Sequence, residues 1–259
     1  MIYLYEKDFI NLLNLINYLL KNKIEPLNIK DIDYMPNLFE KTYFKNIELD
    51  NNLIDRIINK IGYYAFRVIY YVYLSDKKDK ELLIYKFLSV SLKYKSKVCY
   101  QRNIDVVSDC LKISKYVKCE AHKFKGFIRF KDLNGVLYSE MEPENNILLI
   151  LSNHFKNRLK NEYWIIKDKK RNIISIYNKK DFYITSSNDI DIKINLKDDY
   201  YEEMWKSFYK TVAIKERKND RCRMNFMPKK YWKYIMNKYI PKYTFIHGNS
   251  PQSFTNMFV

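Results

Sequence analysis

The sequence predicts an α+β protein with a helical N-terminal part, followed by a mainly antiparallel sheet that is built from hairpins and packed with helices. Apolar residues recur at helical spacing through most of residues 1–122. After that point, short runs of β-branched and aromatic residues alternate with turn signals. The chain has 259 residues, of which 47% are apolar and only 4 are glycine, so it can bury a substantial core.

The same patterns predict the domain organisation. We expect residues 1–240 to form one domain, helix-rich over 1–122 and hairpin-rich over 123–240. Pro241 ends the last predicted helix, and residues 242–259 have the composition of a loose tail, so we assign 241–259 as a C-terminal tail. The sequence contains no internal repeat.

The N-terminal part begins with a short strand over residues 2–5, after which Asp8 can cap a helix that runs to about Leu20. Residues 21–50 contain two prolines and are expected to form a connection with one short helix. Apolar residues at a 3.6-residue period then predict three further helices, over residues 51–74, 81–94 and 101–122.

Two hairpins are expected in the later part, over about 124–141 and 163–185. In the first, residues 125–131 alternate and precede Asn134-Gly135, a pair typical of a type I′ turn. The second turns at Asp168–Arg171. Helices are predicted over 145–159, from Asp198, and from Pro228 after a basic connection.

The formal net charge of +17 is distributed unevenly. Residues 1–110 contain 17 basic and 14 acidic side chains, whereas residues 111–259 contain 30 and 16. A composition rich in lysine, asparagine, isoleucine and tyrosine could place basic residues anywhere on a solvated surface. The uneven distribution, with interleaved aromatic residues, instead favours contact with nucleic-acid phosphates and bases in the later part.

Several classes of protein are not expected. The first residues lack a basic segment before an apolar run, and the longest apolar stretch, residues 63–74, is too short to span a bilayer and contains Arg67. We therefore expect a cytoplasmic protein without membrane contact. None of the four cysteines forms a C-x-x-C pair, so they are expected to be buried, reduced thiols. With only three histidines, no metal site and no cofactor is predicted.

Basic residues supply the candidate binding sites. His154 and Arg158 lie four residues apart and so share one helix face, where they could bind a phosphate or form an interior polar pair. On a strand, Lys125, Phe127 and Arg129 would point to one side. A third cluster of basic residues lies in segment 217–230, which could contact phosphates or simply be solvated.

Acid–base chemistry is a second possibility. Glu120, His154 and Asp168 are candidate acid–base groups for an enzyme that acts on nucleic acids or nucleotides. Asp168 and Arg171 flank two lysines of a tight turn, where an ion pair across the turn is also expected. The sequence has no Walker loop, dinucleotide fingerprint, nucleophile elbow or deaminase signature, so no reaction is assigned.

An ordered set of short motifs resembles a bacterial family of DNA metabolism proteins whose core is a domain of unknown function. These motifs are Tyr3-Leu4-Tyr5, Glu120-x-His122, Gly126-Phe127-x-Arg129-Phe130, His154-Phe155-x-x-Arg158, Trp164-x-Ile166-x-Asp168-x-x-Arg171, Trp205-x-x-Phe208-Tyr209, Ile214-x-x-Arg217-x-Asn219 and Met227-Pro228-x-x-Tyr231-Trp232. The resemblance covers roughly residues 1–240. It departs from the family pattern where Asp220 follows Asn219 and where Arg223 stands at the expected glutamine.

The resemblance implies a setting in DNA repair, alongside a radical SAM protein and domains like uracil-DNA glycosylase. It singles out five basic residues as candidates for nucleic-acid binding: Arg129, His154, Arg158, Arg171 and Arg217. We expect them to form a cluster lined by Trp164, Trp205 and Tyr209, which could stack on bases or could equally belong to the core. We therefore expect a nucleic-acid-binding accessory protein that acts with a radical SAM partner. The alternatives are the enzyme described above and a scaffold whose basic face binds an acidic protein.

Overall fold

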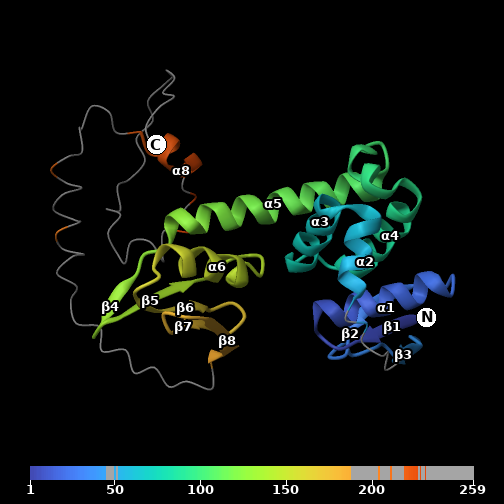
Figure 1. The fold of residues 1–259 in the computed structure, drawn as a ribbon, viewed down its shortest axis with the longest axis horizontal. Helices are drawn as coiled ribbons and strands as arrows, with labels where there is room; N and C mark the ends of the chain where they lie inside the picture. The colour runs from blue at the N-terminus through green and yellow to red at the C-terminus, as the bar shows by residue number, and fades with distance from the viewer. Residues whose placement is uncertain are drawn as a thin grey trace. The chain divides into compact units, whose positions relative to one another are not determined.

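The computed structural model describes residues 1–44, 50, 52–187, 204, 211, 219–226, 228 and 231. The chain divides into two compact units, Met1–Leu196 and Lys197–Val259. The first contains a three-stranded and a five-stranded sheet with helices α1 to α6, and the second contains α8 (Asp220–Phe226), as Figure 1 shows. The predicted α+β class is confirmed. The unit boundary falls inside the single domain that the sequence predicts, and that assignment stays a prediction.

A small parallel sheet opens the first unit. Strand β1 (Ile2–Tyr5) lies between β2 (Asn28–Asp31) and β3 (Thr42–Phe44), and α1 (Phe9–Lys21) connects β1 to β2. The Asp8 side chain caps α1 by accepting a hydrogen bond from the Ile10 N–H, as predicted. The expectation of a connection over residues 21–50 is wrong, because two strands of three or four residues form there. Strands this short carry too few residues to establish a hydrophobic period.

Five helical segments follow: α2 (Leu53–Ile61), α3 (Tyr63–Leu74), α4 (Lys80–Tyr94), the 3₁₀ helix η1 (Lys95–Tyr100) and α5 (Asp105–Phe127). The single helix expected over 51–74 is broken at Gly62, whose φ of 83° and ψ of 152° are accessible almost only to glycine. The hydrophobic period does not reveal the break, because Ile61 and Ala65 are buried on either side of it.

Helix α5 is longer than the sequence predicts. It continues through Phe127, so the strand expected from Lys125 is wrong, and β4 (Lys131–Leu133) begins later. Phe124 and Ile128 are both buried, and their spacing of four residues matches one face of a helix. The predicted strip of Lys125, Phe127 and Arg129 along a strand therefore does not exist.

The second sheet has the order β4-β5-β6-β7-β8. Its remaining strands are β5 (Val136–Met141), β6 (Tyr163–Asp168), β7 (Ile173–Tyr177) and β8 (Phe182–Ser186). Asn134 and Gly135 both have positive φ, as the predicted hairpin turn requires. Every pairing is antiparallel except that of β5 with β6, because α6 (Leu148–Arg158) connects these two strands. The mainly antiparallel sheet is confirmed.

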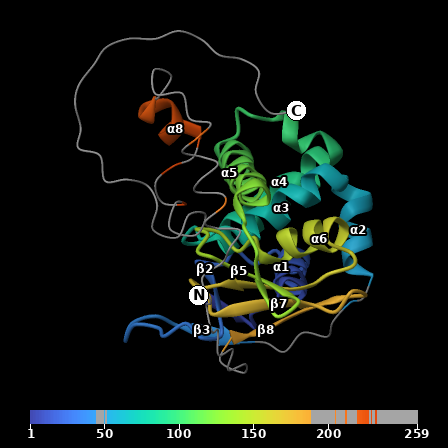
Figure 2. The ribbon, with the colours of Figure 1, turned by 90° about the vertical axis from the view of Figure 1, so that its left-hand side faces the viewer.

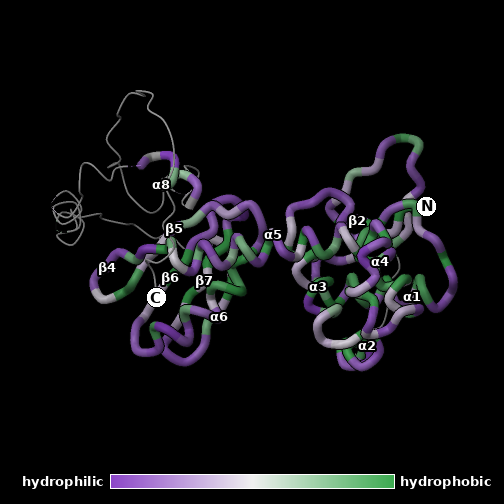
Figure 3. The backbone as a smooth tube through the Cα atoms, turned by 90° about the horizontal axis from the view of Figure 1, so that it is seen from above, coloured by the Kyte–Doolittle hydropathy of each residue, from purple (hydrophilic) through white to green (hydrophobic). Residues whose placement is uncertain are grey.

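Helix α6 packs against β6, β7 and β8 and covers one face of this sheet (Figure 2). Hydrophobic residues gather in β7, whereas the turn between β6 and β7 is hydrophilic (Figure 3). Trp164 is fully buried and stacks on Tyr177, with 5.0 Å between the ring centroids. The packing of α6 on the sheet includes a hydrogen bond of 2.7 Å between the hydroxyl groups of Ser152 and Ser175, and α6 carries two of the predicted binding residues.

Some expectations concern other parts of the chain. Residues 220–226 form α8 where the sequence predicts a basic connection, and the Asn219 side chain accepts a hydrogen bond from the Cys222 N–H at the start of this helix. In the helix expected from Asp198, the described residues Met204 and Thr211 are helical; the rest of that helix, most of the helix expected from Pro228 and the tail over 241–259 lie outside the described residues. Of the four cysteines, Cys99 and Cys110 are buried as expected, but Cys119 and Cys222 are exposed.

Among the residues that the structure describes, every helix is either too short or too polar to cross a lipid bilayer.

Candidate nucleic-acid interface

The C-terminal half of α5 concentrates positive charge. Between residues 116 and 130 the chain has one carboxylate, that of Glu120, together with these basic residues: Lys118, Lys123, Lys125 and Arg129. Glu120 is buried, so its charge does not face the solvent beside these cations. Cations near the C-terminus of a helix also stabilise that helix, which accounts for part of the pattern. The solvent-facing side of this half-helix is therefore strongly positive.

A shallow hollow of about 390 Å³ lies beside this part of α5. Its lining comes from α3, α5 and α6: Tyr70, Lys125, Leu149, Ile150, Asn153, His154 and Asn157. Burial lowers the pKa of His154, and the nearby charges of Lys125 and Arg158 lower it further. The His154 ring thus lies close to both Lys125 and Arg158, and the imidazole is neutral at pH 7. Among the described residues, no carboxylate forms an ion pair with these three side chains.

Arg129 lies just beyond the end of α5. Its guanidinium Nη1 donates hydrogen bonds to the carbonyl oxygens of Gly126 and Ile128, at 2.6 and 3.0 Å. Partial burial lowers the pKa of Arg129. One nitrogen of this side chain therefore caps the last turn of α5, and the residue itself stays exposed.

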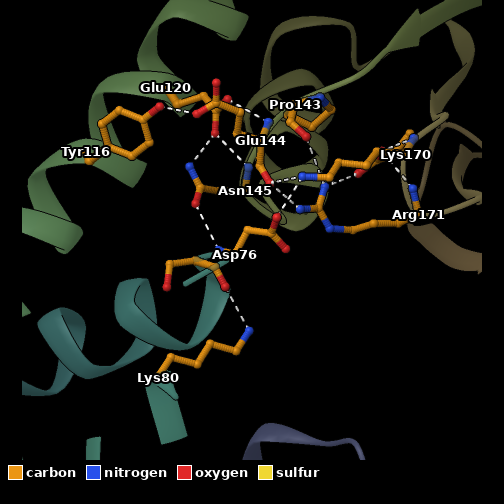
Figure 4. Close-up of polar contacts among 11 residues, drawn as sticks. Asp76, Lys80, Tyr116, Glu120, Pro143, Glu144, Asn145, Lys170 and Arg171 are labelled. Atoms are coloured by element: carbon orange, nitrogen blue, oxygen red, sulfur yellow. Dashed lines mark hydrogen bonds and ion pairs between the residues drawn. The ribbon is translucent and has the colours of Figure 1, made fainter. Parts of the chain in front are cut away.

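A network of polar contacts holds the loop between β5 and α6, as Figure 4 shows. The Glu120 carboxylate accepts hydrogen bonds from the N–H groups of Glu144 and Asn145 and from the Asn145 side-chain amide, at 2.6–2.9 Å. Asn145 Oδ1 in turn accepts from the Asp76 N–H. Lys170 Nζ donates to the Asp76 carboxylate at 2.8 Å and to the Glu144 carbonyl at 3.1 Å. The network joins four segments that are far apart in sequence.

Arg171 belongs to the same network. Its guanidinium donates to the carbonyl oxygens of Pro143 and Glu144 and to the Asp168 carboxylate, which is 3.0 Å away and fully buried. Asp168 also accepts hydrogen bonds from the backbone N–H groups of Lys170 and Arg171. Burial raises the pKa of Asp168, although the Arg171 charge and these hydrogen bonds lower it. The ion pair expected across this turn is present, and it engages Arg171 in holding the loop.

The other aromatic and basic candidates lie elsewhere. The Trp164 ring is in the core of the five-stranded sheet, so its contacts are with the protein. Trp205, Tyr209 and Arg217 lie outside the described residues. The structure therefore places His154 in the lining of the hollow with the Arg158 charge nearby, places Arg129 at the end of α5, and places Arg171 in the loop network.

The three candidate acid–base groups have different surroundings. Glu120 and Asp168 are buried and accept hydrogen bonds from loop backbone groups, whereas His154 lines the hollow. Among the described residues, no hydrogen bond or ion pair joins His154 to either carboxylate. Of the three groups, only His154 lines the hollow, and the two carboxylates are engaged by loop backbone groups.

The sequence does not predict that Lys125 and Tyr70 line the same hollow as His154. It predicts Lys125 on a strand and indicates no binding role for Tyr70. The spacing of Phe124 and Ile128 is the signal that places Lys125 on α5. Nothing local in the sequence indicates that Tyr70, from α3, reaches the same hollow.

Comparison with protein families gives one match. The model of a family described as a domain of unknown function, DUF4130, matches residues 78–237. The chain belongs to the DUF4130 family. This match includes α4 to α6 and the five-stranded sheet, and it excludes the N-terminal sheet and α1 to α3. Lys125, His154 and Arg158 therefore lie within the DUF4130 region. Comparisons with curated proteins and with solved structures gave no match.

Proposed function

We propose that this DUF4130 protein binds nucleic acid through the positive surface formed by α5 and α6. The observation that supports the proposal is that Lys125 and His154 line one hollow and that His154 also lies within the field of the Arg158 charge, while none of the three has a carboxylate ion-pair partner among the described residues. By contrast, other cations of the same helices are paired, as Lys112 is with Asp109. Cations without such partners are available to phosphates.

The chemistry of the three side chains suits this role. Lysine and arginine attract phosphates and release the counterions condensed on the polyanion. The neutral imidazole of His154 can donate one hydrogen bond to a phosphate oxygen without adding to the repulsion among the cations. Asn153 and Asn157 add polar groups to the lining. This combination binds phosphates with little dependence on base sequence.

The proposal includes a setting in DNA metabolism. The resemblance described above implies a DNA-repair setting alongside a radical SAM protein, and we propose that this chain presents nucleic acid to such a partner. The buried positions of Glu120 and Asp168 favour this binding role over the alternative of an acid–base enzyme. If instead the basic face binds an acidic protein, that partner should co-purify while the chain fails to bind polynucleotides.

Titration of a fluorescently labelled duplex and a single strand with the full chain tests the proposal. We expect saturable binding at low salt that weakens steeply as the salt concentration rises. In a plot of the logarithm of the binding constant against the logarithm of the salt concentration, the slope should be about −0.7 per phosphate contact for a single strand and about −0.9 for a duplex. A neutral polymer of similar size controls for non-specific adsorption. Absence of binding to both oligonucleotides at low salt would refute the proposal.

A further inference from the structure

Helix α3 has an aromatic side that faces solvent. Its buried side is mainly aliphatic and consists of Ala65, Val68, Ile69, Val72 and Leu74. On the other side, the residues Tyr63 and Tyr64 are 63% and 57% exposed. Neighbouring exposed rings form a contiguous patch, and such patches point to interaction sites more strongly than single exposed residues do.

Two cations lie among these tyrosines. The Arg67 guanidinium is 5.8 Å from the ring centroids of both Tyr63 and Tyr71, and it donates a hydrogen bond to the Tyr71 hydroxyl at 3.2 Å. From α5, Lys118 Nζ is 4.9 Å from the Tyr71 ring centroid and 5.4 Å from that of Tyr64. Within the described parts of the chain, neither cation forms an ion pair with a carboxylate. We name Tyr63, Tyr64, Arg67, Tyr71 and Lys118 the tyrosine strip.

The tyrosine strip leads to the hollow. The ring centroids of Tyr71 and Tyr70 are 6.2 Å apart, and Tyr70 lines the hollow with Lys125 and His154. On α5, Lys118 and Lys125 are seven residues apart, which places them on the same face with a separation of about 10 Å along the axis. Rings and cations thus alternate over a distance that extends beyond a single nucleotide.

We propose that the tyrosine strip binds the unpaired bases of a single-stranded nucleic acid, whose phosphates contact Arg67, Lys118 and Lys125. This inference rests on the proposed function, and it selects single strands over duplexes. Base–aromatic stacking needs a free base face, which a duplex does not offer along its length. The cations hold the tyrosine rings in place, and more than half of Tyr63 and of Tyr64 remains accessible to a base.

Substitution of the two exposed tyrosines tests this inference in the full-length protein. We expect the double variant Tyr63→Ala/Tyr64→Ala to bind a labelled oligothymidylate about tenfold more weakly, because each lost stack weakens binding. The double variant Tyr63→Phe/Tyr64→Phe keeps both rings and should bind within about twofold of the wild type. Tyr183→Ala, at a tyrosine of β8 that is 61% exposed, is the matched control and should also leave affinity unchanged. Affinity for a duplex should stay unchanged in all three variants.

The outcomes separate this inference from the proposed function. If the alanine variant binds the single strand normally while Lys125→Ala/Arg158→Ala weakens binding, the tyrosine strip is not a base-binding surface and the phosphate site stands. An equal loss for single strand and duplex would also overturn the inference. If the wild type binds neither oligonucleotide, the proposed function fails, and the inference that rests on it fails with it.

A second experiment uses only the wild-type protein, so its result does not depend on whether a variant folds. Photo-crosslinking of the wild-type protein to an oligonucleotide that contains 5-iodouracil should modify Tyr63, Tyr64 or Tyr71, as located by mass spectrometry of tryptic peptides. Crosslinks found only on other elements would contradict the proposal. Far-ultraviolet circular dichroism and thermal melting of each variant show whether a loss of affinity reflects a loss of structure.

Discussion

Replacement of Arg171 by alanine is expected to lower the free energy of unfolding by about 3–5 kcal/mol, the usual cost of removing one partner from a buried ion pair. The Asp168 carboxylate would remain buried without its guanidinium, and the carbonyl oxygens of Pro143 and Glu144 would each lose a donor. Urea unfolding monitored by circular dichroism measures the effect.

The pH dependence of the free energy of unfolding distinguishes loss of the Asp168–Arg171 ion pair from a general loss of packing. Burial raises the pKa of Asp168, and loss of the Arg171 charge raises it further in the folded protein. A carboxyl group with a raised folded-state pKa favours the folded state when protonated, and this contribution is lost as the pH rises through that pKa. The difference in stability between Arg171→Ala and the wild type should therefore be largest near pH 7 and should narrow as the pH falls toward about 4.

A second substitution provides the control. In Asp168→Asn/Arg171→Ala the buried group is neutral, so this double variant should be more stable at neutral pH than Arg171→Ala alone. A defect in Arg171→Ala that is independent of pH, with no recovery in the double variant, would show that the buried charge is not its cause.

Replacement of Glu120 by alanine is expected to lower the free energy of unfolding by about 3 kcal/mol or more, since three donors that now bond to its carboxylate would lose their acceptor. Two of these donors are backbone N–H groups of the loop that leads from β5 into α6. Because α6 carries His154 and Arg158, affinity for nucleic acid should fall as well. Thermal and urea unfolding measure the stability, and the titration described above measures the affinity.

Glu162→Ala removes an exposed carboxylate from the same unit and serves as the matched control, with an expected change within about 0.5 kcal/mol. Glu120→Gln keeps one acceptor oxygen and should be less destabilising than Glu120→Ala. Stability of Glu120→Ala equal to that of Glu162→Ala would contradict the role assigned to the Glu120 network.

The features predicted correctly from sequence depend on residues that are close together in the chain. Asn134-Gly135 forms its turn because both residues readily accept positive φ, and the Asp168–Arg171 pair spans only one turn. The break at Gly62 also has a local cause, but a glycine inside a helical pattern does not by itself end a helix. The two short strands beside β1 form only because the chain returns to that strand, and no local pattern records this return.

The sequence predicts only those parts of the candidate site that depend on residues close together in the chain. His154 and Arg158 share a helix face through their spacing alone. The role of Arg171 in the loop network depends on its hydrogen bond to the Glu144 carbonyl oxygen. Lys170 pairs with Asp76, which lies 94 positions before it in the chain. Trp164 looks suitable for base stacking in the sequence, but its neighbours across the sheet bury it. Long-range packing therefore decides which basic and aromatic residues are available to a ligand.

The dependence of affinity on salt, compared between two double variants, tests most directly whether Lys125 and Arg158 bind phosphates. The control variant Lys112→Ala/Lys156→Ala removes two lysines from the same helices, both of which are paired with aspartates. For Lys125→Ala/Arg158→Ala we expect weaker binding of a single strand and a salt slope smaller in magnitude by about 1.4, whereas the control should match the wild type. Equal slopes and affinities for the two variants would contradict the proposed interface.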